Sequence, residues 1–411
     1  MLVSHPSAIA ASRPPATALA ITKLRLNNFR NYQSLDLDFP NEPVSIVLVG
    51  PNGAGKTNML EALSLLAPGR GLRRAKADLL PRRGSGKSNP KANPEMVASL
   101  AWSVSAQLIT DDAPLFLGTG TLPQDHVETG RRVIKINGEF SSQAALAEHL
   151  AVSWLTPDMD GVLAAAPSER RRFLDRLVIA FDPAHAGRIQ RYEKAYRQRN
   201  RLMEENHGDQ HWFEALEAQL AESGMAIIAA RQALVEALDI EAASPWPTFP
   251  AARLRLEGDA EDWLATMPAV DAEDRIRGEA RRHRLNGTAT MPGPMNSLLV
   301  VSHSGTGQDA DMSSTGEQKA LVISVILAHA RLQSKRLKRP PLLLLDDIVS
   351  HLDEARRRSL FDLTTNLSGQ VWFSGTDAAM FADMPGQPSF VFVDAGEAKG
   401  EPYFPAVVRS S

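Results

Sequence analysis

Two short runs near the start of the chain alternate apolar and polar residues, which is the pattern of half-buried strands. They lie in ITKLRLNNFRNYQSLDLDF, residues 21–39, and a continuous apolar run, VSIVLV, follows at 44–49. An unbroken apolar run of this length is typical of a strand that is buried on both faces. Strand-like patterns return at 97–109 and in RRVIKINGEF, residues 131–140. The N-terminal part of the chain therefore predicts sheets.

From 168 to 285 the pattern changes to long charged stretches such as GRIQRYEKAYRQRNRLMEEN, which predict helices. An apolar strand pattern resumes near 296 and continues into a final α/β segment. The sequence thus predicts an α/β domain formed by residues 21–165 and 292–411, with a mainly helical insert at 166–291. Residues 1–20 contain Pro pairs and no long apolar core, so we expect a disordered leader.

The composition excludes several classes of protein and leaves others open. The chain has 411 residues, with 45 Lys plus Arg against 48 Asp plus Glu, so the total charge neither supports nor excludes a nucleic-acid partner. No cysteine is present, which excludes disulfides and cysteine-bound zinc and fits a reducing cytoplasm. No apolar run reaches the roughly 18 residues of a membrane span. We expect a cytoplasmic protein without a membrane partner.

A glycine-rich loop after the run at 44–49 predicts a phosphate site. Its sequence is GPNGAGKT, Gly50 to Thr57, and a helical pattern follows it. Glycines let backbone N–H groups turn toward phosphates, and the helix that follows offers its positive end. In this motif the Lys56 ammonium reaches the β and γ phosphates, and the Thr57 hydroxyl binds Mg²⁺.

A second apolar strand pattern, PLLLLDD, ends in Asp346 and Asp347. In P-loop enzymes an acid at this place holds Mg²⁺, which suits Asp346. Asp347 then lies where a carboxylate could orient or deprotonate an attacking water. The alternative is that the two aspartates simply cap a turn.

The stretch SSTGEQ, residues 313–318, leads directly into a long apolar helical pattern. Taken alone, it is typical of an ordinary helix N-terminus, whose first N–H groups are satisfied by small polar side chains.

The blocks NFRNY, GPNGAGKTNMLEAL, STGEQKA, LLLLDD and SHLD occur in this order along the chain. This arrangement resembles the ABC-type ATPases of the SMC and Rad50 group, and within that group the RecF family of DNA-repair proteins. The resemblance covers roughly residues 21–377. It implies an ABC-ATPase head, with a P-loop and a mixed sheet, that carries an inserted helical arm.

The resemblance also implies roles for individual residues. The sites for ATP and Mg²⁺ would include Gly50, Asn52, Gly53, Ala54, Gly55, Lys56, Thr57 and Asn58, with Arg30, Asn31 and the D-loop residue Asp353 nearby. Thr57 and Asp346 would be the metal ligands, and Asp346 and Asp347 the catalytic acids. The signature motif would be Ser314, Thr315, Gly316, Glu317 and Gln318, placed over the γ-phosphate of a second subunit, with its helix N–H groups left free for that phosphate.

Three features depart from the family pattern. Residues 293–300 read GPMNSLLV and lack the His-Arg pair common in RecF-like chains. No Q-loop glutamine is evident, and the nearest candidates for the switch histidine are Thr376 and Asp377. We therefore expect slow ATP hydrolysis, which suits a switch.

A basic segment lies within the predicted helices. Between 169 and 201 there are ten Lys or Arg and four acids, with Tyr192 and Tyr196 interleaved. Such a patch can hold DNA phosphates, and the alternative is a solvated helical face. Within this segment the candidate DNA contacts are Arg188, Arg191, Lys194 and Arg197.

The resemblance implies an ATP-dependent DNA-binding protein of recombinational repair and replication-fork maintenance. Such a protein binds gapped DNA as an ATP-closed homodimer and is a weak, DNA-stimulated ATPase. With RecO- and RecR-type partners it helps to load a RecA-type recombinase. The alternative is the nucleotide-binding subunit of an ABC transporter, although such subunits normally have a shorter helical subdomain.

Overall fold

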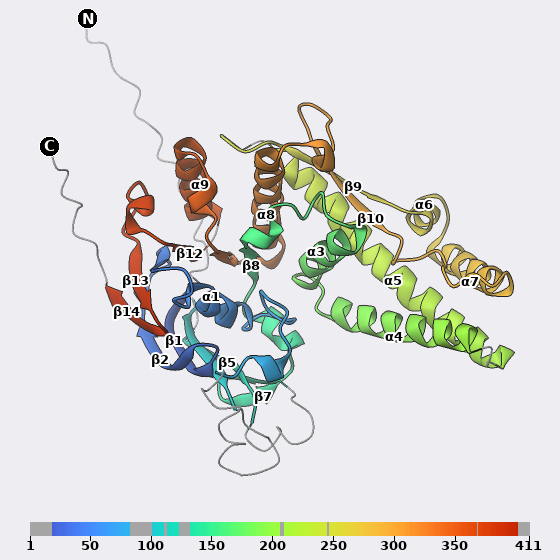
Figure 1. Ribbon diagram of the computed structural model, residues 1–411, viewed down its shortest axis with the longest axis horizontal. Helices are drawn as coiled ribbons and strands as arrows, with labels where there is room; N and C mark the ends of the chain where they lie inside the picture. The colour runs from blue at the N-terminus through green and yellow to red at the C-terminus, as the bar shows by residue number, and fades with distance from the viewer. Residues whose placement is uncertain are drawn as a thin grey trace, which may run out of the picture.

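The computed structural model describes residues 19–82, 101–110, 113–122, 132–205, 209–244, 246–367 and 369–401 (Figure 1). The first 18 residues of the predicted leader lie outside this part of the chain. Its last two residues contradict the prediction, because Leu19 is buried and Ala20 is the first residue of a strand. Both are apolar, and with Ile21 they form a buried run at the start of β1, ahead of the alternating part of the strand.

The central sheet has six strands in the order β14-β13-β3-β12-β11-β8. Their bounds are β3 Ile46–Val49, β8 Val152–Leu155, β11 Leu342–Leu345, β12 Val371–Gly375, β13 Ser389–Asp394 and β14 Glu397–Glu401. Only the pairing of β13 with β14 is antiparallel. The mixed α/β sheet predicted for the head is thereby confirmed.

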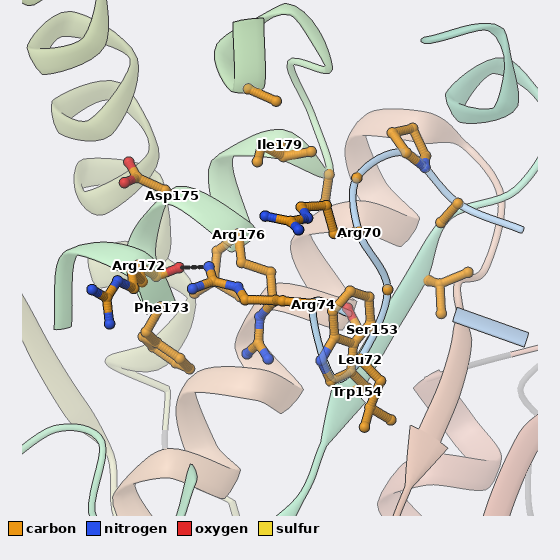
Figure 2. A pocket seen from close by; sticks show the side chains of 18 of the residues that line it. Arg70, Leu72, Arg74, Ser153, Trp154, Arg172, Phe173, Asp175, Arg176 and Ile179 are labelled. Carbon is orange, nitrogen blue, oxygen red and sulfur yellow. Dashed lines mark hydrogen bonds between the residues drawn. The ribbon is translucent and has the colours of Figure 1, made fainter. Parts of the chain in front are cut away.

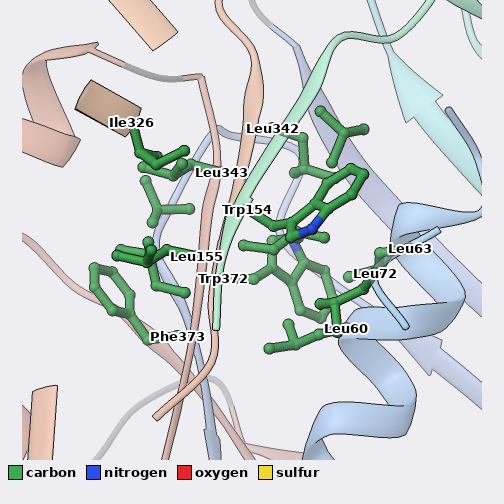
Figure 3. Close-up of a cluster of buried hydrophobic side chains, with 14 of the residues drawn as sticks. Leu60, Leu63, Leu72, Trp154, Leu155, Ile326, Leu342, Leu343, Trp372 and Phe373 are labelled. Atoms are coloured by element: carbon green, nitrogen blue, oxygen red, sulfur yellow. The ribbon is translucent and has the colours of Figure 1, made fainter. Parts of the chain in front are cut away.

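Helices cover both faces of this sheet, which explains its unbroken apolar strands. Helix α1, Lys56–Ser64, contributes Leu60 and Leu63 beside Trp154 and Trp372 (Figure 3). Helix α8, Thr315–Leu337, contributes Ile326 to the buried cluster from the other face (Figure 3). The two motif-bearing helices are therefore fixed to one common core.

A second sheet of six strands is antiparallel, with the order β2-β1-β4-β5-β6-β7. The bounds are β1 Ala20–Phe29, β2 Tyr32–Asp38, β4 Ser103–Ile109, β5 Leu115–Gly120, β6 Val133–Ile136 and β7 Glu139–Ser141. The buried Gln370 side chain joins it to the central sheet by hydrogen bonds to the backbone N–H and C=O of Ile21, each 3.1 Å long. The turn between β1 and β2 then reaches the P-loop.

The remaining helices extend to one side of the head (Figure 1). They are α3 Pro167–Ile179, α4 Ala184–Glu204, α5 Gln210–Ala242, α6 Asp259–Thr266 and α7 Ala269–Leu285, while α9, Glu354–Leu367, belongs to the head. Helix α5 lies in two hydrophobic cores. Phe213 to Ile228 pack with α4 and α7, and Leu234 to Ala242 join the core of the head.

The segment predicted to be mainly helical also contains a strand. Strand β9, Ala252–Glu257, pairs antiparallel with β10, Leu298–His303. The residues ARLRLE alternate apolar and polar, which is a strand pattern that the surrounding charge obscures. The predicted insert and the final segment of the head thus share a sheet, and the exact domain boundaries stay a prediction.

A buried ion network joins α3 and α5 at the base of the helices. The Arg231 guanidinium donates to both carboxylate oxygens of Asp175, at 2.8 and 2.9 Å, and to the backbone oxygen of Pro294 at 2.6 Å. His185 also bonds Asp175, and Ser297 bonds Arg231 at 3.1 Å. Burial alone would raise the pKa of Asp175, but His185 and Arg231 hold it below its usual value. Residues 293–297, where the sequence lacks the His-Arg pair of RecF-like chains, are therefore held by the buried Arg231 side chain.

Candidate ATP-binding site

The P-loop connects β3 to α1, and two of its glycines cannot be replaced without a clash. A Cβ atom on Gly50 would lie 2.0 Å from the backbone oxygen of Val393. Gly55 has a φ of +126°, and a Cβ atom there would lie 2.5 Å from the Asn31 side chain. The loop is thus closed from both sides by neighbouring chain, and glycine is required at both positions for the tight backbone that a phosphate loop needs.

The Lys56 ammonium lies within the loop. Its Nζ atom donates to the backbone oxygens of Gly50 and Pro51, at 2.6 and 2.9 Å. Burial lowers the pKa of Lys56, and the charges of Asp347 and Asp346 act in the opposite direction. The lysine is therefore held at the loop by two carbonyls that an anionic phosphate could replace.

Asp346 follows the last residue of β11 and is buried. One carboxylate oxygen, Oδ1, accepts hydrogen bonds from Thr57 at 3.0 Å and from Ser374 at 2.7 Å. Burial raises the pKa of Asp346, while these two hydroxyl donors lower it. The structure thus brings together the P-loop threonine and the strand-end acid that the sequence predicted as a pair.

Asp347 adopts a left-handed backbone conformation, with φ of 50°. Its N–H donates to the Ser374 hydroxyl at 2.9 Å, which fixes the residue at the end of β12. Its carboxylate atom Oδ1 is buried and has no hydrogen-bond partner among the described residues. A buried acceptor without a donor suits a residue that orients a water molecule or a metal-bound water.

The chemistry of these residues fits Mg²⁺. Thr57 and Asp346 offer hard oxygen ligands at one place, and Mg²⁺ is usually held by one or two protein oxygens together with phosphates and water. Within the described ranges, no group of three or more His, Cys, Asp or Glu residues could hold a metal by itself. A metal at this site would therefore depend on the nucleotide for its remaining ligands.

The turn at Arg30 and Asn31 borders the P-loop. Asn31 Nδ2 donates to the Ala54 oxygen at 2.8 Å, and Asn58 Nδ2 donates to the Asn31 oxygen at 2.7 Å. The Arg30 guanidinium instead makes a two-pronged ion pair with Glu61, at 2.8 and 2.6 Å. A nucleotide contact by Arg30 stays a prediction.

Sequence reasoning missed Glu61, a buried carboxylate on α1 that also pairs with Arg73 at 3.4 Å. The available signal was one acid inside the apolar helical pattern NMLEALSLLA. A buried acid on such a face requires a cationic partner, since an unpaired charge would be costly.

Ser314 is the N-cap of α8. Its hydroxyl accepts from the Glu317 N–H at 3.4 Å, and the Glu317 carboxylate accepts from the Ser314 N–H at 2.9 Å. This capping box corrects the expectation that the N–H groups here are all left free, because Glu317 has an internal partner. Residues 314–317 are nonetheless exposed, and a Cβ atom on Gly316 would touch nothing within 4 Å.

The other family motifs have local partners. Asp353 Oδ1 accepts from the N–H of Arg356 at 2.8 Å, near the start of α9. Asp377, a candidate for the switch position, lies just after β12 and accepts from the N–H of Ala379 at 2.9 Å. Their roles toward a nucleotide stay predictions, as does that of Thr376.

The structure divides the predicted basic segment into buried and exposed parts. Arg199 is buried and paired with Glu217, and Tyr192 belongs to a hydrophobic core, so neither is available to DNA. Arg188 is partly buried and bonded to Asp182. The exposed stripe of α4 consists of Arg191, Lys194, Arg197 and Arg201.

The mostly parallel central sheet, the P-loop after β3 and the paired Thr57 and Asp346 define an ATPase head of the ABC type. The chain matches the family described as "RecF/RecN/SMC N terminal domain" over residues 20–398 and belongs to that family. Within it the chain groups with RecF, as the following similarities show.

A relative from Mesorhizobium japonicum named "DNA replication and repair protein RecF" is 44% identical over 384 residues, which cover 92% of this chain and 96% of the relative. A relative of the same name from Brucella suis is 41% identical and covers 93% of this chain and 96% of its own length. Both similarities span nearly the whole chain.

Two solved structures share the fold. One is described as "the recombination mediator protein RecF-ATPrS in RecFOR pathway", with a TM-score of 0.76, 21% identity, and coverage of 94% of this chain and 99% of that chain. The second is the corresponding RecF-ATP structure, with a TM-score of 0.71, 22% identity, and coverage of 94% and 100%. No helix in the described part of this chain is long and apolar enough to cross a membrane.

Proposed function

We propose that the protein binds ATP and Mg²⁺ and acts in DNA replication and repair as an ATP-gated homodimer. The names of its relatives, and the nucleotides named for the two RecF structures, support the ATP and repair parts. The P-loop amides and Lys56 would hold the phosphates. Thr57 and Asp346 would hold Mg²⁺, which neutralises phosphate charge when it is bound.

Asp347 would orient or deprotonate the attacking water, because its buried carboxylate oxygen lacks a protein donor. Lys56 would exchange its two carbonyl partners for the phosphates. Hydrolysis would be slow, since no Q-loop glutamine or switch histidine is evident in the sequence. A slow reaction suits a protein that acts by switching between a closed and an open state, because such a protein does not need rapid turnover of ATP.

The observation that supports the dimer is the exposure of the signature turn. Residues 314–317 face solvent, while the helix behind them is almost wholly buried between 319 and 330. The hydrogen bonds of the turn are with its own neighbours in 309–318. An exposed, small-residue helix start on a rigid support is suited to the γ-phosphate of a second subunit.

DNA would meet the exposed stripe of α4, and RecO- and RecR-type mediators would help to load a RecA-type recombinase at single-strand gaps. The "RecFOR pathway" named for the related structure supports this assignment. The stripe supplies the cationic groups that phosphate contacts need.

Mixing two variants tests the dimer. Lys56→Ala removes phosphate binding but leaves the signature intact, whereas Gly316→Arg places a long side chain on the exposed signature turn. Neither variant alone should dimerise with ATP and Mg²⁺. A mixture should form heterodimers with one intact composite site, seen by light scattering and by ATP binding.

Gly278→Arg is the matched control, because this glycine is also exposed on a helix and a Cβ atom there has open space. It should dimerise like the unchanged protein. If Gly316→Arg dimerised equally well, or if the mixture regained nothing, the signature would not act across a dimer.

A further inference from the structure

A cavity of about 860 Å³ lies between the segment that follows α1 and helices α3, α4 and α8, and no P-loop residue lines it. Figure 2 shows ten of its lining residues with labels. Its lining comes from the segment 67–74 that follows α1, from β8, from α3 and α4, and from Ile326 and His329 of α8. Small-molecule sites in proteins commonly have volumes of about 300–1,000 Å³. The cavity therefore has the size of a ligand site, and no step proposed above uses it.

Four arginines line this cavity, namely Arg70, Arg74, Arg172 and Arg176. Arg74 Nη2 donates to the backbone oxygen of Arg172 at 2.8 Å, so the two chain segments meet at this point. Burial lowers the pKa of Arg74, as do the charges of Arg172 and Arg70, while Asp175 opposes them. Like charges gathered on one wall are unfavourable unless an anion joins them.

Two of the four carboxylates that line the cavity are paired with cations outside it. Asp175 is held by Arg231 and His185, whereas Asp158, which accepts from the neutral Thr156 hydroxyl, keeps its charge near Arg176. Glu193 pairs with Arg197 at 3.6 Å. Glu169, in the first turn of α3, and Asp158 are then the two acids left to balance the four arginines of the lining. The lining thus keeps an excess of positive charge.

Two buried donors in the lining have no acceptor among the described residues. They are Nη2 of Arg176 and the indole Nε1 of Trp154. The Arg176 guanidinium lies over the rings of Trp154 and Phe173, 5.0 and 5.1 Å from their centroids, and its Nη1 donates to the Met159 sulfur at 3.0 Å. Buried N–H groups normally have acceptors, so the lining lacks a partner rich in acceptor atoms.

We propose that this cavity binds a phosphate-bearing organic anion of about nucleotide size, at a site separate from the P-loop. A phosphate offers several acceptor oxygens and matches the planar fork of arginine. The apolar side chains Leu72, Val152 and Ile179 would cover the organic part. Ligand binding at this cavity uses neither the P-loop nor the dimer, and only its regulatory effect, described next, rests on the function proposed above.

The cavity lies where a bound ligand would influence the closure of the protein on ATP. The segment 67–74 continues from α1, which begins at the P-loop, and α8 begins at the signature turn. A ligand that bridges these elements would stabilise one relative placement of them, and so would change how readily the two motifs close on ATP.

Calorimetric titration of the full chain with AMP tests the proposal. AMP lacks the β and γ phosphates that a P-loop lysine binds, so we expect it to report mainly on the cavity. It should bind at one site per chain. Binding should be at least tenfold weaker in Arg70→Gln/Arg74→Gln, and roughly fivefold weaker in Trp154→Phe, which loses one hydrogen-bond donor.

Two controls locate the bound AMP. Arg82→Gln/Arg281→Gln changes the same total charge at exposed positions outside the cavity and should bind AMP normally. Lys56→Ala should also bind AMP normally, even though it loses ATP binding. A thermal melt of each variant shows whether it is folded.

The proposal would be overturned if the unchanged protein bound no AMP, or if folded Arg70→Gln/Arg74→Gln bound it normally. Loss of AMP in Lys56→Ala would assign the ligand to the P-loop instead. Inorganic phosphate binding as tightly as AMP would reject the organic part of the ligand. A short DNA duplex that needed Arg70 and Arg74, without any AMP binding, would assign the arginines to the DNA backbone.

Discussion

Thr57 Oγ1 donates a 3.0 Å hydrogen bond to Asp346 Oδ1, although the two residues are 289 positions apart in the chain. The order of the central sheet explains this proximity. Strand β12 lies between β3 and β11 and pairs in parallel with both, so the loops at their carboxyl ends meet at one edge. Ser374, at the end of β12, bonds the same aspartate oxygen and holds the pair together.

Replacing the Thr57 hydroxyl should remove the benefit of Mg²⁺ for ATP binding. In Thr57→Val the isosteric side chain keeps its volume but loses its oxygen ligand. We expect the affinity for ATP with Mg²⁺ to fall at least tenfold, while the affinity without Mg²⁺ changes little. Calorimetry with and without the metal measures the ratio. Thr266→Val, at an exposed position of α6, is the control, and an unchanged Mg²⁺ effect in Thr57→Val would contradict the assignment.

Removing Arg231 should destabilise the base of the helical arm. Arg231→Leu leaves the buried Asp175 carboxylate without its two-pronged partner and the Pro294 oxygen without its donor. Breaking a buried pair from one side costs about 3–5 kcal/mol of unfolding free energy. Urea denaturation followed by circular dichroism measures this loss.

Arg277→Leu provides the comparison, since Arg277 forms an exposed pair with Asp274 on α7. Exposed pairs contribute about 0–1 kcal/mol. Equal losses of unfolding free energy in the two variants would show that the buried Asp175 network contributes no more stability than an exposed ion pair.

The buried His329 should make the protein less stable below neutral pH. Its ring bonds Ser153 at 3.0 Å and the Leu177 oxygen at 3.1 Å, and burial, with the charge of Arg176, lowers its pKa to about 4. An unfolded histidine titrates near 6.5, so between these two values the unfolded chain binds more protons than the folded one. Stability is therefore full above about pH 6.5 and is lost as the pH falls toward 4.

Between pH 7 and pH 5 this one group accounts for a loss of about 2 kcal/mol. Urea denaturation of the unchanged protein and of His329→Gln, at both pH values, isolates it. The variant should lose about 2 kcal/mol less than the unchanged protein over this range. The same pH dependence in both proteins would show that other groups cause it.

The exposed stripe of α4 should control the salt dependence of DNA binding. Each phosphate contact contributes about 0.9 to the slope of log affinity against log salt concentration. The triple variant Arg191→Gln/Lys194→Gln/Arg197→Gln should therefore lower the slope by up to about 3. Fluorescence anisotropy with duplex DNA at several salt concentrations measures it.

Arg25→Gln/Lys135→Gln/Lys399→Gln removes three cations from the sheets and serves as the matched control. It should keep the slope of the unchanged protein. If the control lowered the slope as much as the α4 variant, total charge rather than the stripe would determine DNA binding.

The parts of the fold with a regular apolar period could be predicted from the sequence. The run at 44–49 and PLLLLDD contain strands β3 and β11, and both have an unbroken apolar pattern because helices cover both faces of their sheet. Strand β9 could not be separated from the charged helices around it, because its alternating arginines resemble a helical surface. Its pairing with β10 is a long-range contact that no local pattern records.

The candidate site was predictable where a motif fixes both residue type and spacing, as for Lys56 and Thr57. The motifs also located Asp346, but they could not show that Ser374 bonds the same oxygen. The exposure of the basic residues was harder to predict, because charge alone does not distinguish exposed Arg197 from buried Arg199, two positions further along the chain. The helical period puts them on different faces, and only packing shows which face is buried.

Helix α5 has 33 residues and is one continuous element from the distal helices to the core of the head. At a rise of 1.5 Å per residue it spans about 50 Å. Near its head end, Glu241 is clamped by Arg331 at 2.8 Å and Lys335 at 2.6 Å, both from α8. A tilt of roughly 10° in α8 would thereby displace the far tip of α5 by roughly 9 Å. The ion pairs of Glu241 thus give the signature helix a lever about 50 Å long that ends at the distal tip of the insert.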